Sequence, residues 1–109
     1  MAVGPYSSMW LFVSFDLPTL TKEDRRLASG FRNQLLEMGF NMFQLSIYSY
    51  YVTSKGIADT IANRIQRIVP RNGHVAIIFI TDKQFGMIRN FFGEKKIRLD
   101  TPEQALLFE

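Results

Sequence analysis

Residues 10–18 read WLFVSFDLP, and this stretch opens the folded part of the chain. It is a short run of aromatic and branched side chains, and Pro18 ends it because proline cannot donate a hydrogen bond to a sheet ladder. Since the run does not alternate between apolar and polar residues, it predicts a β-strand that is covered on both faces. Asp16 stands at the C-terminal end of this strand.

Two amphipathic helices are predicted downstream of this strand. Thr21 and Asp24 form a short relative of the capping box, and Gly39 can close the first helix in a left-handed conformation. Ser54 can cap the second helix, which ends before Pro70. The side chains expected to face the core are Leu27, Phe31, Leu35 and Met38 in the first helix and Ile57, Ile61, Ile65 and Ile68 in the second.

The remaining segments are rich in strand-forming residues. Residues 40–52 contain neither glycine nor proline, and one long bent strand or two short ones would both fit. Because a strand usually has about five or six residues, two strands that meet near Gln44-Leu45-Ser46 are favoured. Residues 75–80 read VAIIFI and form another apolar run, which predicts a strand covered on both faces. The resulting order predicts an α+β fold, a ferredoxin-like βαββαβ sandwich.

The last strand of that fold lies at an edge of the sheet. An apolar edge strand is an aggregation hazard unless another strand pairs with it. We therefore predict that a strand from a second copy of the chain covers this edge, which makes the protein a homodimer.

One domain accounts for most of the 109 residues. We expect residues 1–8 to be a disordered leader or an artificial remnant, residues 9–92 to form the ferredoxin-like domain, and residues 93–109 to be a C-terminal segment that docks on the partner subunit. No run approaches the roughly 18 apolar residues of a membrane helix, and no signal peptide is recognised. We therefore expect a cytoplasmic protein without membrane contacts. The absence of cysteine argues against disulfides and structural zinc.

Asp16 is the carboxylate whose position indicates chemistry. A strand end is rigid and solvent-accessible, which suits a metal ligand. Two copies of Asp16 across a two-fold axis would suit Mg²⁺, with waters and a phosphate completing the octahedron. In the alternative reading, Asp16 only accepts hydrogen bonds in the turn that ends at Pro18. His74, the single histidine, is assigned no role.

Basic side chains gather on the two predicted helices and at their ends. The formal charge of +3 favours acidic partners such as nucleic acid. Basic stripes suit a phosphate backbone, although an ordinary solvated face would look the same in the sequence. The candidate nucleic-acid-binding residues are Lys22, Arg25, Arg26, Arg32, Arg64, Arg67 and Arg71.

A succession of short motifs resembles the second CRISPR-associated core protein family, the small dimeric partner of the CRISPR spacer integrase, in its type II branch. The motifs are FDLP at 15–18, MGF at 38–40, QLSIY at 44–48, TDKQF at 81–85 and GEKK at 93–96. Their order and spacing cover almost the whole domain from Met9 onward.

The resemblance implies a ferredoxin-like homodimer of the virulence-associated-protein-D-like endonuclease fold, with an additional C-terminal strand that crosses to the partner. It also implies CRISPR spacer acquisition as the function, with integrase subunits and double-stranded DNA as partners. Members of the family are described as endonucleases in which the aspartate that matches Asp16 is catalytic and holds Mg²⁺ between the subunits.

Three functions are compatible with these features. The favoured one is an adapter that bridges integrase dimers and holds the duplex of the incoming DNA. The second is a metal-dependent endonuclease acting on RNA or DNA, in which Asp16 holds the ion and Arg25, Arg26 or Arg32 stabilises developing charge. The alternative from a different class is a ferredoxin-like regulatory or RNA-binding module that uses an exposed sheet face.

Overall fold

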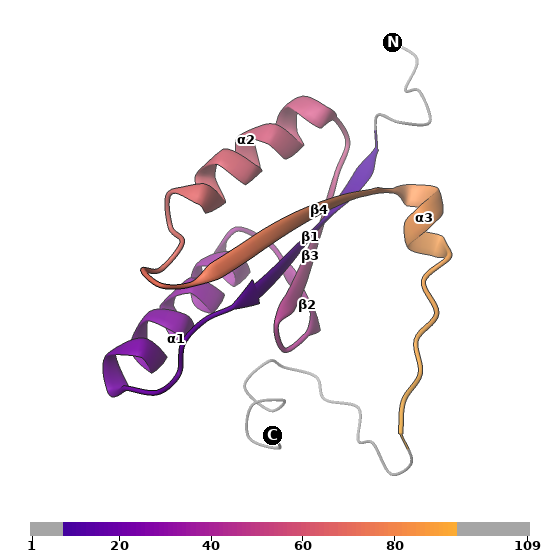
Figure 1. Cartoon of the computed structure of the whole chain (residues 1–109). Coiled ribbons are helices and arrows are strands. Elements are labelled where there is room, and N and C mark those ends of the chain that lie inside the picture. Colours follow the sequence, from indigo (N-terminus) through magenta and orange to yellow (C-terminus); the bar gives the residue numbers. More distant parts are fainter. Residues whose placement is uncertain (1–7, 94–109) are drawn as a thin grey trace.

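Two helices cover one face of a four-stranded antiparallel sheet (Figure 1). The computed structural model describes residues 8–93. The elements are β1 (Met9–Asp16), α1 (Lys22–Glu37), β2 (Asn41–Gln44), β3 (Ile47–Val52), α2 (Lys55–Gln66), β4 (His74–Thr81) and α3 (Asp82–Gly86). The strand order β2-β3-β1-β4 is the ferredoxin-like arrangement that the sequence predicts. Apart from Ser8 and Gly93, the predicted leader and the predicted C-terminal segment, with its additional strand, lie outside the described residues.

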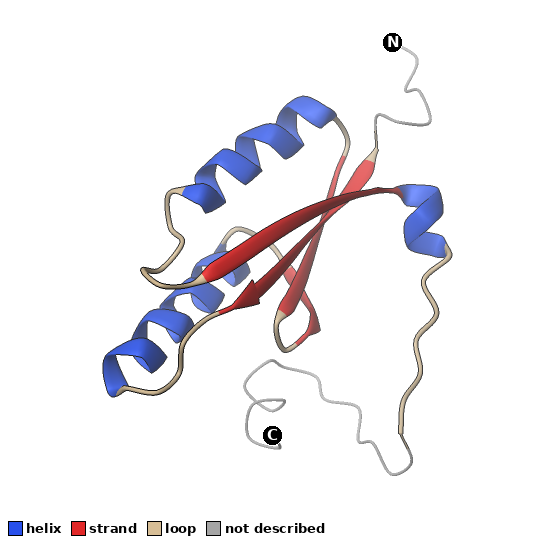
Figure 2. Cartoon of the chain, viewed as in Figure 1, coloured by secondary structure: helices blue, strands red, loops and turns tan. Residues whose placement is uncertain are grey.

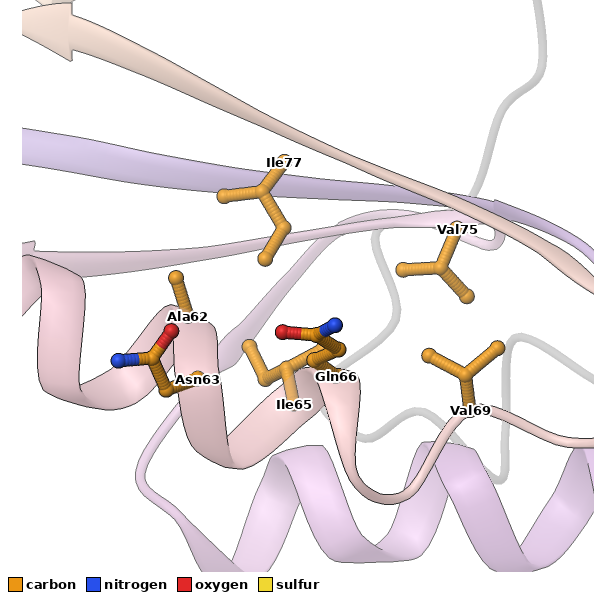
Figure 3. A pocket seen from close by; sticks show the side chains of 7 residues that line it. All are labelled: Ala62, Asn63, Ile65, Gln66, Val69, Val75 and Ile77. Atoms are coloured by element: carbon orange, nitrogen blue, oxygen red, sulfur yellow. The ribbon is translucent and has the colours of Figure 1, made fainter.

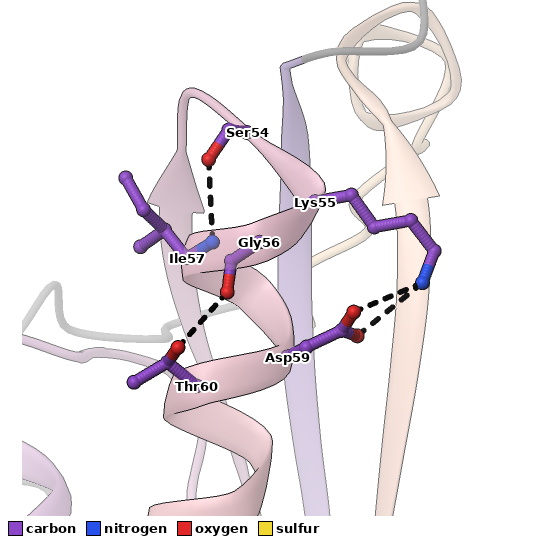
Figure 4. Close-up of polar contacts among 6 residues, drawn as sticks. All are labelled: Ser54, Lys55, Gly56, Ile57, Asp59 and Thr60. Carbon is purple, nitrogen blue, oxygen red and sulfur yellow. Dashed lines mark hydrogen bonds and ion pairs between the residues drawn. The ribbon is translucent and has the colours of Figure 1, made fainter.

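The two long helices begin and end where the local sequence predicts. The Thr21 hydroxyl accepts a hydrogen bond from the Asp24 backbone N–H at 2.9 Å, and the Asp24 carboxylate accepts one from the Thr21 N–H at 3.2 Å. At the start of α2 the Ser54 hydroxyl accepts from the Ile57 N–H at 3.2 Å (Figure 4). Gly39 has a φ of 100°, the left-handed conformation expected after α1.

Residues 40–52 form two strands, as predicted. The turn between β2 and β3 falls at Leu45 and Ser46, and the Ser46 carbonyl accepts a hydrogen bond from the Phe15 N–H at 3.0 Å. This bond ties the turn to the end of β1, which is the central partner of both β3 and β4.

The hydrophobic core lies between the sheet and the two helices. Leu11 and Val13 of β1 pack there with Phe31 of α1 and Ile65 of α2, and all four side chains are buried. One predicted core position is wrong: Ile57 is 47% exposed, and the neighbouring Ala58 is completely buried in its place. Alanine lets α2 lie close to the sheet, whereas isoleucine at that position of the helix would hold it away.

The opposite face of the sheet, which we call the open face, is covered only in part. It is formed by Trp10, Phe12, Ser14, Ser49, Tyr51, Ile78 and Ile80, which register and strand alternation place on one side. The short helix α3, seen beside the end of β4 in Figure 2, brings Phe85 onto Trp10 with ring centroids 3.7 Å apart. Phe12 is buried beneath Phe43 and Phe85, so β1 is covered on both faces as predicted.

β4 differs from the prediction that both of its faces are covered. It lies at the edge of the sheet and pairs only with β1 among the described strands. None of its residues is fully buried, and Ile78 on the open face is 50% exposed. Among residues 8–93, this apolar edge strand therefore has an unpaired edge and a partly exposed face.

We expect Gly39→Ala to lower the free energy of unfolding by about 1–2 kcal/mol, because a left-handed φ is strained for any residue with a Cβ atom. The added Cβ would also lie 3.0 Å from Cε1 of Tyr50. Chemical denaturation checks this value. Gly30→Ala is the matched control, since no atom lies within 4 Å of its Cβ position inside α1, and alanine there should stabilise the helix. A Gly39→Ala protein as stable as the wild type would contradict the prediction.

Candidate metal and nucleic-acid site

Asp16 ends β1 with an exposed side chain. The register places it directly opposite His74 at the start of β4, and alternation places both on the side of the open face. The sequence alone does not reveal this neighbour, because the pairing register of β1 and β4 is what brings the two residues together. The structure thus presents one carboxylate and one imidazole at the same end of the sheet.

The described residues of one chain do not assemble a complete metal site. Within residues 8–93 no group of three or more histidine, cysteine, aspartate or glutamate side chains gathers to hold an ion. Mg²⁺ is usually held by one or two protein carboxylates together with waters and phosphate oxygens. Asp16 supplies one carboxylate of the kind that such a site uses.

Arg25 and Arg26 at the start of α1 are engaged in local contacts, whereas the exposed Lys22 side chain makes no hydrogen bond or ion pair with a described residue. Arg25 donates through Nη1 to the carbonyls of Thr19 and Leu20, at 3.1 and 3.3 Å, and so fixes the loop between β1 and α1. Arg26 Nε donates to the Glu23 carboxylate at 2.9 Å. This pairing lowers the pKa of the Glu23 carboxyl and raises the pKa of Arg26.

The end of α2 presents cations without such partners. Arg64 and Arg67 are exposed, and their side chains make no hydrogen bond or ion pair within the part of the chain that is described. Arg71 lies close enough to Glu23 for its charge to help lower the pKa of that carboxyl, which brings the loop after α2 near the start of α1. From Pro18 to His74 the chain carries eight basic and four acidic residues, so the layer of helices is positively charged.

Arg32 is placed differently from the other candidates. It is half-buried in the middle of α1, and its Nε is buried without a hydrogen-bond partner. It lines a cleft of about 120 Å³ together with Asp16, Thr19 and Ser46. Asp16 thus borders the cleft of Arg32 from the end of β1, although alternation turns its side chain toward the open face. Arg64 and Arg67 lie on the layer of helices, away from this cleft.

A second cavity, of about 330 Å³, lies between α2 and β4 (Figure 3). Its lining consists of apolar side chains such as Ile65 and Ile77 together with the amides of Asn63 and Gln66. Because no ionisable side chain lines it, this cavity offers neither an acid–base pair nor a cation site. In addition, no helix among residues 8–93 has the length and apolarity to cross a membrane.

The fold and the site together define a class: a small ferredoxin-like α+β domain with a carboxylate at a strand end and a positively charged layer of helices. The sequence profile of the family described as CRISPR associated protein Cas2 matches residues 9–88. The chain therefore belongs to the CRISPR-associated Cas2 family, and its function lies in CRISPR spacer acquisition. This confirms the family and the function that the short motifs imply.

Individual relatives agree with this assignment. The chain is 46% identical to the CRISPR-associated endoribonuclease Cas2 of Flavobacterium psychrophilum, a match covering 95% of this chain and 90% of the relative. It is 42% identical to the protein of the same name from Paracidovorax avenae, covering 94% and 96%. A solved structure titled "Crystal structure of cas2" superposes with a TM-score of 0.56 over 87% of this chain and all of that one. At 19% identity, this structure supports the fold alone.

Proposed function

We propose that the protein is a homodimeric adapter in CRISPR spacer acquisition, which bridges integrase subunits and holds the duplex of the incoming DNA against its helices. The observation that carries the proposal is the contrast between the two sides of the sheet. The layer of helices is positively charged, and the side chains of Arg64 and Arg67 have no partner among residues 8–93. The open face is apolar and incompletely covered. A cationic surface suits a phosphate backbone, and an exposed apolar face suits another protein surface.

The open face is the surface that we assign to the dimer. Tyr51 and Ile78 are 42% and 50% exposed, and large apolar side chains are also exposed directly after α3. Two copies packed with their open faces together would cover these groups and direct both layers of helices outward. The free edge of β4 can accept a strand from the C-terminal segment of the partner. We expect this dimer to work in the cytoplasm.

We further propose a shared Mg²⁺ site, because the dimer would bring the two Asp16 carboxylates toward its two-fold axis. When bound, the ion would polarise a phosphate oxygen and lower the pKa of a coordinated water. Asp16 would hold the ion, and His74, its pairing partner in the register of β1 and β4, would be available to take up a proton. The names of the relatives, CRISPR-associated endoribonucleases, support nuclease activity as a second function.

The duplex-binding part of the proposal is tested with Arg64→Gln/Arg67→Gln. We expect weaker binding of a short DNA duplex. We also expect the negative slope of log affinity against log salt concentration to become less steep, by roughly 1 for each phosphate contact removed. Fluorescence anisotropy at several salt concentrations measures both quantities. Lys83→Gln/Arg89→Gln removes the same charge outside α1 and α2, so it should leave the slope close to that of the wild type. Equal slopes for the two double variants would contradict duplex binding by the helices.

A further inference from the structure

We propose that the cleft lined by Arg32, Thr19 and Ser46 binds an oxyanion, namely a backbone phosphate of a nucleic acid held next to Asp16. The inference rests on the proposed function, because it assigns a contact to the nucleic acid that the adapter holds. It also separates Arg32 from the other basic residues, which lie on the exposed surface of the helices.

The buried Nε of Arg32 is the first observation. It makes no hydrogen bond with any described residue, and Arg32 forms no ion pair with Asp16 although both line the cleft. A buried donor without an acceptor raises the free energy of the folded state. A guanidinium stays protonated in proteins, so it cannot reduce this cost by losing its proton. An acceptor that carries negative charge would satisfy both the donor and the charge of Arg32.

The size and lining of the cleft are the second observation. Its volume of about 120 Å³ is well above the roughly 10–15 Å³ that a single water needs, so a tetrahedral anion fits. Thr19 and Ser46 supply hydroxyl groups, and Phe15 and Ala28 supply apolar contacts. Asp16 and Leu17 complete the lining, so the cleft offers an anion the Arg32 guanidinium on one side and faces a carboxylate at the end of β1.

The loop that carries Thr19 is already held in place. Arg25 donates two hydrogen bonds to the carbonyls of Thr19 and Leu20, which fixes one wall of the cleft and adds a second positive charge beside it. The Ser46 carbonyl, bonded to the Phe15 N–H at 3.0 Å, fixes the other wall. Because both walls are set before any ligand arrives, binding requires only that the Arg32 side chain turn its buried Nε toward the cleft.

A phosphate bound to Arg32 would lie beside the strand end that carries Asp16. Arg32 would then hold the nucleic-acid strand in a fixed position relative to the carboxylate. We regard Arg32 as a positioning residue, since its contact is with the phosphate and it transfers no proton.

The test observes the Nε–H signals of the arginines by ¹⁵N NMR in the full chain. The Arg32 signal is identified by its loss in Arg32→Lys. We expect it to shift on titration with inorganic phosphate, with dimethyl phosphate and with a short DNA duplex. The Arg26 signal is the internal control for the two small ligands, because its Nε already donates to Glu23. Arg32→Lys should weaken phosphate binding by roughly tenfold, since lysine lacks the planar fork of donors.

Ser46→Leu is a second variant, which enlarges a side chain that lines the cleft and leaves Arg32 in place. We expect the Arg32 signal of this variant to shift less with each ligand, so the inference can be tested even if Arg32→Lys does not fold. An Arg32 signal that no ligand moves overturns the inference. A signal that moves with inorganic phosphate but not with the diester or the duplex overturns the nucleic-acid assignment.

The outcomes also separate this inference from the proposed function. If duplex binding depends on Arg64 and Arg67 but the Arg32 signal does not shift, the adapter proposal is supported and anion binding in the cleft is refuted. If the Arg32 signal shifts with phosphate but the protein neither binds a duplex nor supports integration, the adapter proposal is refuted. The cleft would then be an anion site without that function.

Discussion

Ile78→Glu is expected to convert the proposed dimer into a monomer. Ile78 lies on β4, opposite Phe12 in the register of the open face, and half of its side chain is exposed in one chain. A dimer that packs through this face would bury two copies of the new carboxylate without a cation to pair with them. Burying unpaired charge costs several kcal/mol, so the dimer should be weakened by at least about a hundredfold.

Sedimentation velocity at micromolar concentration measures this effect. We expect the wild type at twice the chain mass of 12.6 kDa and the variant at the mass of one chain. Ile57→Glu is a closely matched control, because Ile57 is 47% exposed but lies on α2, on the other side of the sheet. It should remain dimeric. A monomeric wild type, or a dimeric Ile78→Glu, would refute the proposed interface.

Asp16→Asn is expected to reduce Mg²⁺-dependent cleavage of RNA or DNA by about a hundredfold or more, while the fold and the dimer persist. Asparagine keeps the size of the side chain and one oxygen ligand but removes the charge that attracts a hard cation. Asp16 makes no ion pair in the described part of the chain, so the substitution breaks no contact within it. Cleavage assays with and without Mg²⁺ measure the loss.

Asp59→Asn is the control for Asp16→Asn. It also neutralises an exposed aspartate, and it breaks only the surface pair with Lys55, at 3.1 Å, which is worth about 0.5 kcal/mol or less. Its cleavage activity should match the wild type. Equal activity of Asp16→Asn and Asp59→Asn would mean that Asp16 does not hold a catalytic ion.

The same two variants decide how far metal chemistry matters for spacer integration. In a reconstituted reaction with the cognate integrase and a short duplex, the adapter proposal expects Asp16→Asn to integrate normally. Loss of integration while the dimer and duplex binding persist would make metal chemistry essential. The adapter proposal would then be wrong.

Local sequence was sufficient for most of the fold. Thr21 and Ser54 predicted where the helices begin, and Gly39 predicted where the first one ends, because caps depend on a few neighbouring residues. Strand length correctly divided residues 40–52 into two strands. The order of elements then predicted that β4 lies at an edge, since few topologies accommodate that order.

Long-range contacts decided the rest. The spacing of apolar residues defined a stripe on α2, but packing against the sheet selected its rotation and buried Ala58 where Ile57 was expected. Arginines that look alike in the sequence have different contacts in the fold. Arg26 pairs with Glu23, whereas the buried Nε of Arg32 has no hydrogen-bond partner among residues 8–93. The position of His74 opposite Asp16 follows from the register of β1 and β4. Patterns and caps are properties of neighbouring residues, but the partner of a side chain depends on which distant segment the fold brings beside it.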